Sequence, residues 1–126
     1  MNRTGIQQID DFADNEPRPP PFSEEELALD FAETHATDLR HVAAWGKWLH
    51  WTGSKWMLDD TLYAFDQARK ICRAAAAACN SKMRRSLASA KTVAAIERLA
   101  KADRRIAATV EQLDADRFRL NEEQQP

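Results

Sequence analysis

Residues 45–60, WGKWLHWTGSKWMLDD, hold all four tryptophans of this 126-residue chain within their first twelve positions. Residues 47–51 and 55–58 are rich in side chains that suit a pleated sheet, and Thr52-Gly53-Ser54 between them has turn chemistry. The stretch therefore predicts a β-hairpin over residues 46–58. Because a lone hairpin is marginally stable in water, we expect several of the large tryptophan rings to clamp it against helices.

The sequence before the hairpin predicts a polar tail and then a helix. Residues 1–22 are polar and acidic and end in PRPPPF, a composition typical of a disordered tail with a stiff proline end. Ser23, with Glu26 three residues later, has the pattern of a capping box. We therefore expect the first helix to begin at about residue 24 and to run to about residue 35.

The sequence after the hairpin predicts three more helices. Asp59-Asp60 can cap a helix over residues 61–83, where apolar side chains recur at steps of three and four. A third helix is expected over residues 87–102, and Asp103 can cap a fourth. Residues 122–126 are polar and are expected to form a short tail.

Length and composition favour one small domain over residues 23–121, mainly α within the α+β class, with one hairpin after the first helix. No apolar stretch is long enough to span a membrane, and the N-terminus lacks the features of a secretory signal. We therefore expect a cytoplasmic protein that has no membrane partner. Cys72 and Cys79 are seven residues apart on a predicted helix, which is too far for a disulfide, and we expect two small buried side chains.

Charge is distributed very unevenly along the chain. Residues 1–38 hold ten acids and two bases, a net charge of −8, whereas residues 39–126 carry a net charge of +6. Residues 67–105 alone hold eleven bases and two acids, a net charge of +9. An asymmetry of this size bears on partners and solubility rather than on fold.

The basic segment suggests contact with nucleic acid. Lysine and arginine can bind phosphates without reading sequence, and exposed tryptophans can stack on unpaired bases. Trp51 and Trp56 flank the turn of the hairpin and are expected to be the most exposed tryptophans. The alternative is that the bases form an ordinary solvated face, or that the acidic tail covers them. The candidate phosphate contacts are Arg69, Lys70, Arg73, Arg84, Arg85, Arg104 and Arg105.

Several other motifs do not support an enzyme or a cofactor site. TGSK at residues 52–55 shares letters with a phosphate loop but lacks its first glycine, its spacing and its strand–loop–helix context. The spacings of His35, His41 and His50 fit no common metal site, so ordinary polar or half-buried histidines are favoured. We therefore predict no catalytic residues, no metal and no cofactor.

The segments LALDFAETHATDLRHVAAWGKWLHWTGSKWMLDD and IAATVEQLDADRFRLN together resemble a known family. They look like the accessory domain that precedes the motor in phage- and plasmid-type primase–helicases, which are related to the poxvirus primase–helicase and carry superfamily 3 motors. The resemblance covers about residues 24–121. Its recurring elements are a leading helix ending in Asp38-Leu39-Arg40, a hairpin with Trp48, Trp51, Gly53 and Trp56, an Asp before a helix, and a downstream pattern at Asp114, Asp116, Leu120 and Asn121.

The chain departs from that family after Asn121, where Glu-Glu-Gln-Gln-Pro replaces the glycine-rich segment that leads into the motor. The resemblance therefore implies the accessory domain alone, as a remnant or a short relative, without helicase activity. Its implied work is non-catalytic support of assembly or DNA engagement in replication. The alternative is a protein-interaction module or inactive remnant that docks on a helicase or primase motor protein, or on a second copy of itself, without contacting DNA.

Overall fold

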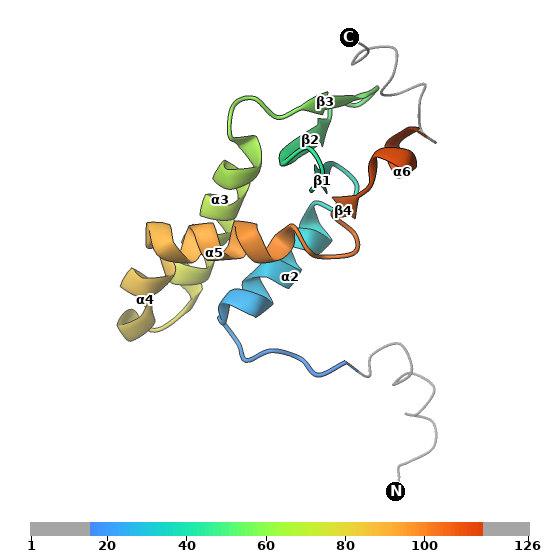
Figure 1. The fold of residues 1–126 in the computed structure, drawn as a ribbon. Coiled ribbons are helices and arrows are strands. Elements are labelled where there is room, and N and C mark those ends of the chain that lie inside the picture. The colour runs from blue at the N-terminus through green and yellow to red at the C-terminus, as the bar shows by residue number, and fades with distance from the viewer. Residues whose placement is uncertain (1–15, 115–126) are drawn as a thin grey trace, which may run out of the picture.

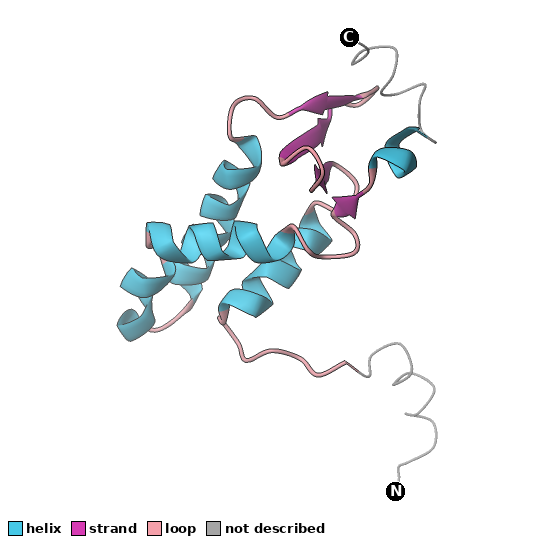
Figure 2. Ribbon diagram, viewed as in Figure 1, coloured by secondary structure: helices cyan, strands magenta, loops and turns pink. Residues whose placement is uncertain are grey.

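The computed structural model describes residues 16–114, which form a group of packed helices with a small sheet at one end (Figures 1 and 2). The prediction of a mainly helical α+β domain with a hairpin is confirmed. Residues 16–22 contain no helix or strand, while the rest of the predicted tails lies outside the described residues. The elements in chain order are α2 (Glu24–Thr34), β1 (Leu39–Val42), β2 (Lys47–Trp51), β3 (Trp56–Leu58), α3 (Tyr63–Ala78), α4 (Ser81–Leu87), α5 (Ala90–Ala100), β4 (Ala107–Ala108) and α6 (Val110–Asp114).

The start of α2 follows the predicted cap. Ser23 Oγ accepts a hydrogen bond from the backbone N–H of Glu26 at 3.1 Å. The Glu26 carboxylate in turn accepts one from the backbone N–H of Phe22 at 2.6 Å, one residue earlier than an ideal capping box. Together these bonds satisfy two N–H groups and fix where the helix begins.

The hairpin is confirmed, and it belongs to a larger sheet than the sequence predicted. β2 and β3 pair antiparallel, with Trp51 opposite Trp56. Gly53 in the connecting turn has φ of 110°, a conformation that glycine adopts without strain. The full strand order is β3-β2-β1-β4, in which β1 runs antiparallel to β2 and parallel to β4.

The expectation that Asp38-Leu39-Arg40 ends the first helix is wrong. The helix stops at Thr34, and residues 35–38 turn back with the Asp38 carboxylate 3.0 Å from His35 Nδ1. Leu39 then opens β1 and is fully buried between the sheet and the helices. These residues form a strand because they pair with β2 on one side and with β4 on the other. The local sequence does not predict either pairing.

The predicted single helix over residues 61–83 is two helices. The first begins at Tyr63, two residues later than predicted, and Asp59 caps it as expected, because its carboxylate accepts the backbone N–H groups of Tyr63 and Ala64, both at 2.9 Å. It ends at Ala78 because Cys79 is extended, and Asn80 then caps α4 by accepting the backbone N–H of Lys82 at 3.0 Å. Asparagine is a strong cap residue, and here the cap overrides the helical apolar pattern.

The last two predicted helices begin later than expected. Ser89 caps α5, so this helix starts at Ala90 rather than at residue 87. Asp103 caps no helix, because its carboxylate binds Arg105 and the chain enters β4. α6 begins only at Val110, after Thr109 and Gln112 exchange hydrogen bonds of 2.8 and 3.0 Å.

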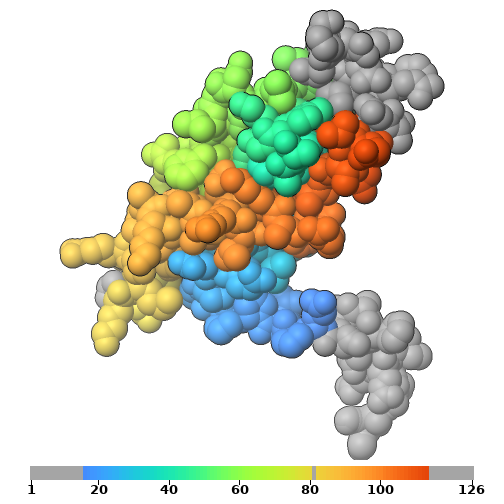
Figure 3. Space-filling model, viewed as in Figure 1, coloured from blue at the N-terminus to red at the C-terminus, as the bar shows by residue number. Residues whose placement is uncertain are grey.

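Side chains alternate between the two faces of the sheet and divide the buried residues into two cores. Leu39 and Trp48 point into the main core with α2, α3 and α5. Leu49 and Trp56 point the other way, into a smaller core that Leu113 of α6 helps to close. On the face shown in Figure 3, α5 (orange) lies between α2 (blue) and the strands (green).

Trp48 is the clamp between hairpin and helices that the sequence predicted. Its indole Nε1 donates to the Glu97 carboxylate of α5 at 2.7 Å. The ring centroid lies 5.8 Å from that of Phe31 on α2 and 5.2 Å from that of His41 on β1, both in edge-on geometry. One side chain therefore joins β1, β2, α2 and α5.

We predict that Trp48→Phe lowers the free energy of unfolding by about 2 kcal/mol or more, because it removes a hydrogen bond to a charged group and leaves a partial cavity. Urea denaturation followed by far-UV circular dichroism measures this change. Trp45→Phe is the matched control, because Trp45 is 41% exposed and its replacement is expected to change stability by less than about 0.5 kcal/mol. Equal effects of the two substitutions would contradict this role of Trp48.

Candidate nucleic-acid interface

Five of the seven predicted phosphate contacts lie on α3 and α4, on side chains that are all exposed. The buried stripe of α3 is Ala64, Ala68, Cys72 and Ala75, so its bases project from the rest of the helix surface. Arg69 forms an exposed ion pair with Asp66 at 2.9 Å, one turn earlier on the same helix. These five bases, named here the α3–α4 basic surface, are Arg69, Lys70, Arg73, Arg84 and Arg85.

The other two predicted contacts, Arg104 and Arg105, lie elsewhere, in the turn that follows α5. α4 comes before the N-terminal end of α5, whereas this turn follows the C-terminal end of the same helix (Figure 1). α5 has 11 residues, which at about 1.5 Å per residue separates its ends by roughly 16 Å. The predicted bases therefore form two groups rather than one patch.

Arg104 and Arg105 line a surface groove of about 400 Å³ together with a third arginine, Arg40 of β1. Trp56 of β3 and Gln112 of α6 are also part of its wall, and none of the described residues that line it is acidic. We call this feature the arginine groove. Sequence reasoning did not assign Arg40 to a site, although Arg40 ends the Asp38-Leu39-Arg40 element that carried the family resemblance.

Arg40 is held in place by its surroundings. Its Nη1 donates to the backbone carbonyls of Ala36 at 2.6 Å and Leu39 at 2.8 Å. Its Cζ lies 5.2 Å from the centre of the Trp56 ring, within the range of a cation–π contact. Its guanidinium therefore has a fixed position at one side of the groove.

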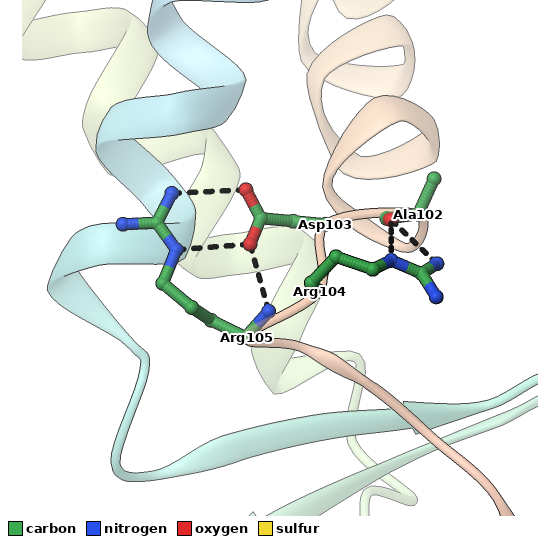
Figure 4. A network of polar contacts seen from close by, with 4 residues as sticks. All are labelled: Ala102, Asp103, Arg104 and Arg105. Atoms are coloured by element: carbon green, nitrogen blue, oxygen red, sulfur yellow. Dashed lines mark hydrogen bonds and ion pairs between the residues drawn. The ribbon is translucent and has the colours of Figure 1, made fainter. Parts of the chain in front are cut away.

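Arg104 and Arg105 are held by different partners, and Figure 4 shows their guanidinium groups on opposite sides of the turn. Arg105 forms a two-pronged pair with Asp103, in which Nε and Nη2 each donate at 2.9 Å. Hydrogen bonds from Arg105 hold the pKa of Asp103 below its usual value, and the same contacts raise the pKa of Arg105. Arg104 donates from Nε at 3.1 Å and from Nη2 at 2.8 Å to the carbonyl of Ala102.

The expected exposure of the tryptophans is wrong for Trp56. Trp56 is only 5% exposed, because it lies in the smaller core with Leu113 and under Arg40. Trp51 is half-buried, with its ring centroid 5.3 Å from that of Trp56. The tryptophan with the largest exposed fraction is Trp45, at 41%. Trp56 therefore offers no open ring face on which a base could stack, as the prediction requires.

The expectation of polar or half-buried histidines holds for His50 and is wrong for the other two, because His35 is only 6% exposed and His41 only 7%. His35 faces Asp38, and His50 stacks on Tyr63 with ring centroids 4.2 Å apart. Between residues 16 and 114, no three His, Cys, Asp or Glu side chains converge on a point that could hold a metal ion. Cys72 and Cys79 are both buried and free, as expected, and burial raises the pKa of the Cys72 thiol.

His41 makes the stability of the domain depend on pH. Burial is the main cause that lowers its pKa below the usual 6.5, and the positive charge of Lys101 adds to this. Below pH 6.5 the unfolded chain therefore takes up a proton before the folded chain does, so folding stability is lost as the pH falls from 6.5 towards the lowered pKa.

We predict that His41→Gln loses less stability than the wild type between pH 7.5 and pH 5.5, because it lacks this titration. Urea unfolding of both proteins at the two pH values measures the difference. His50→Gln is the control, because His50 lies in the same sheet but is only half-buried. An identical loss in the wild type and His41→Gln would show that His41 does not contribute.

The fold and the site define a class: a small α+β domain that carries exposed bases on two helices and a separate groove walled by arginines. No described helix has the length and apolar composition needed to cross a bilayer. The chain belongs to the family described as D5 N terminal like, whose model matches residues 28–123. The resemblance to the accessory domain that precedes the motor of phage and poxvirus primase–helicases is thereby confirmed. Comparison with curated proteins and with solved structures gave no match.

Proposed function

We propose that this domain is a non-catalytic accessory part of a mobile-element DNA primase–helicase and that it engages DNA during replication. The observation that carries the proposal is the α3–α4 basic surface in a chain of this family. The family corresponds to the segment before the motor rather than to the motor itself, which favours an accessory role over a catalytic one.

The α3–α4 basic surface has the chemistry for contact with a phosphate backbone. Its five bases are exposed. One of them, Arg69, forms an ion pair with Asp66 on the same helix. Each phosphate contact releases counterions from DNA, so affinity falls with salt in proportion to the number of contacts. Such contacts give affinity without sequence specificity, which suits a domain that accompanies a moving motor.

We predict that the domain binds labelled DNA and that, if all five bases engage, its affinity falls between about 50 and 200 mM salt by roughly 500-fold for double-stranded and roughly 130-fold for single-stranded DNA. Fluorescence anisotropy measures this dependence. Replacing Arg84 and Arg85 together by alanine is expected to weaken binding at the lower salt and to reduce the salt slope by about two contacts.

The control removes two exposed bases from other elements, Lys47→Ala with Arg98→Ala, and so changes the net charge equally. This control is expected to bind nearly as the wild type does. Absence of binding at about 50 mM salt contradicts DNA engagement by this domain, and equal weakening by both double variants contradicts the assignment to α3 and α4.

A second candidate function, protein docking, has an observation of its own. Large apolar side chains are exposed on the hairpin and at its exit: Trp45 is 41% exposed, Leu58 42% and Leu62 74%. Trp45 and Leu58 line a mostly apolar groove of about 350 Å³ with Lys47 and Leu49. In this candidate the surface docks on a motor protein or on a second copy, and the chain is an interaction module or an inactive remnant that does not contact DNA.

We predict that docking on a second copy, if it is the function, gives a mass that rises with concentration and changes little with salt, because apolar contacts are weakly screened. Sedimentation equilibrium measures the mass. Trp45→Ser with Leu58→Ser is expected to abolish the rise, whereas Leu99→Ser, at a position that is 39% exposed on α5, leaves it unchanged. A constant monomer mass in the wild type excludes the second copy as the partner.

A further inference from the structure

Leu62, directly before α3, is exposed in a way that the fold does not require. Its side chain is 74% exposed, the largest fraction of any large apolar side chain that the structure describes. Its backbone is left-handed, with φ of 63° and ψ of 34°, a conformation that costs free energy in a residue that carries a Cβ. Asp59 caps the helix, so capping does not explain a leucine at this position. Strain and exposure that persist together point to a function outside the fold.

Leu62 forms part of the wall of a surface hollow, named here the α3 hollow. Its volume is about 500 Å³, within the size range of small-molecule sites. Much of the wall is apolar, and one of its rings, that of Tyr63, is held in place by stacking on His50 with centroids 4.2 Å apart. The described residues that line it are Thr61, Leu62, Tyr63, Phe65, Asp66 and Arg69.

The α3 hollow adjoins the α3–α4 basic surface. Arg69 lines the hollow and is also one of the five residues of that surface. Leu62, Arg69 and Arg73 follow one another at spacings of seven and four, so they lie along the same side of the helix. An apolar hollow therefore continues directly into a row of exposed basic side chains.

We propose that the α3 hollow takes an unpaired nucleobase of a single DNA strand, whose phosphates contact the basic side chains further along α3. The inference rests on the proposed function and deepens it, because it names a single strand as the form of DNA that this surface engages. A single strand joins flat apolar groups to phosphates, whereas a duplex has to unpair and unstack a nucleobase before it can enter a hollow.

The charge of the α3 hollow favours a nucleobase over a phosphate. Asp66 and Arg69 pair at 2.9 Å, so each offsets much of the charge of the other. A phosphate in the hollow would meet the Asp66 carboxylate, whereas a neutral nucleobase meets apolar walls and a polar rim that can both donate and accept hydrogen bonds. The phosphates of the strand therefore lie against Lys70 and Arg73, which are exposed on the same helix. Apolar side chains placed against nucleobases are a recurring device of DNA-binding proteins.

The test is fluorescence anisotropy of the full chain at about 50 mM salt. The three labelled probes are an oligothymidylate, an abasic strand with the same number of phosphates, and a duplex of the same length. The wild type is expected to bind the oligothymidylate about fivefold or more tightly than the abasic strand, because contact with one nucleobase is typically worth at least that factor.

Leu62→Ser is expected to weaken oligothymidylate binding about fivefold and to leave the other two probes within about twofold. The salt slope stays unchanged, because no charge is lost. Leu99→Ser is the matched control, since it makes the same change at a position that is 39% exposed on α5, and it is expected to leave all three affinities unchanged.

Leu62→Gly separates loss of the contact from loss of the fold. It is expected to weaken oligothymidylate binding as Leu62→Ser does, while the midpoint of urea denaturation does not fall, because glycine adopts φ of 63° without strain. A lower midpoint would show that the Leu62 side chain serves the fold, and would overturn the proposal.

Failure of this inference is distinguishable from failure of the proposed function. If no probe binds at about 50 mM salt, both fail. If the oligothymidylate and the abasic strand bind equally, or if Leu62→Ser weakens all three probes alike, DNA engagement stands and the α3 hollow does not take a nucleobase.

Discussion

The contact of Trp48 with the helices is the interaction on which the rest of the domain depends. A small sheet of short strands cannot stabilise itself in water, so it needs an apolar partner. Trp48 supplies the link because its ring packs edge-on against Phe31 while its Nε1 binds Glu97 at 2.7 Å. The apolar contact gives stability, and the hydrogen bond fixes the register of β2 along α5.

The parallel pairing of β1 with β4 shapes both the sheet and the arginine groove. His41 lies opposite Ala107, and the backbone N–H of His41 donates to the carbonyl of Ile106 at 2.9 Å. The same pairing brings the turn after α5 beside the start of β1. Arg104 consequently comes to line the same groove as Arg40.

The domain presents two basic features of different character. The α3–α4 basic surface consists of exposed side chains on helices, which suits contacts of low specificity with a phosphate backbone. The arginine groove is concave and its guanidinium groups are held by carbonyls, a carboxylate and an aromatic ring. The family places both features in a domain that accompanies a primase–helicase motor.

The sequence by itself determined the features that depend on neighbours within about five residues: the Ser23 cap of α2, the turn at Gly53, and the hydrogen bonds of Asp59 to the first turn of α3. Such signals are local because a cap or turn is satisfied by backbone groups a few positions away. Only the tertiary structure decided that Leu39 opens a strand, that Trp56 is buried, and that Arg40 and Arg104 line one groove. Each of these depends on a partner remote in the chain, and an apolar or basic residue carries no local mark of which partner it will meet.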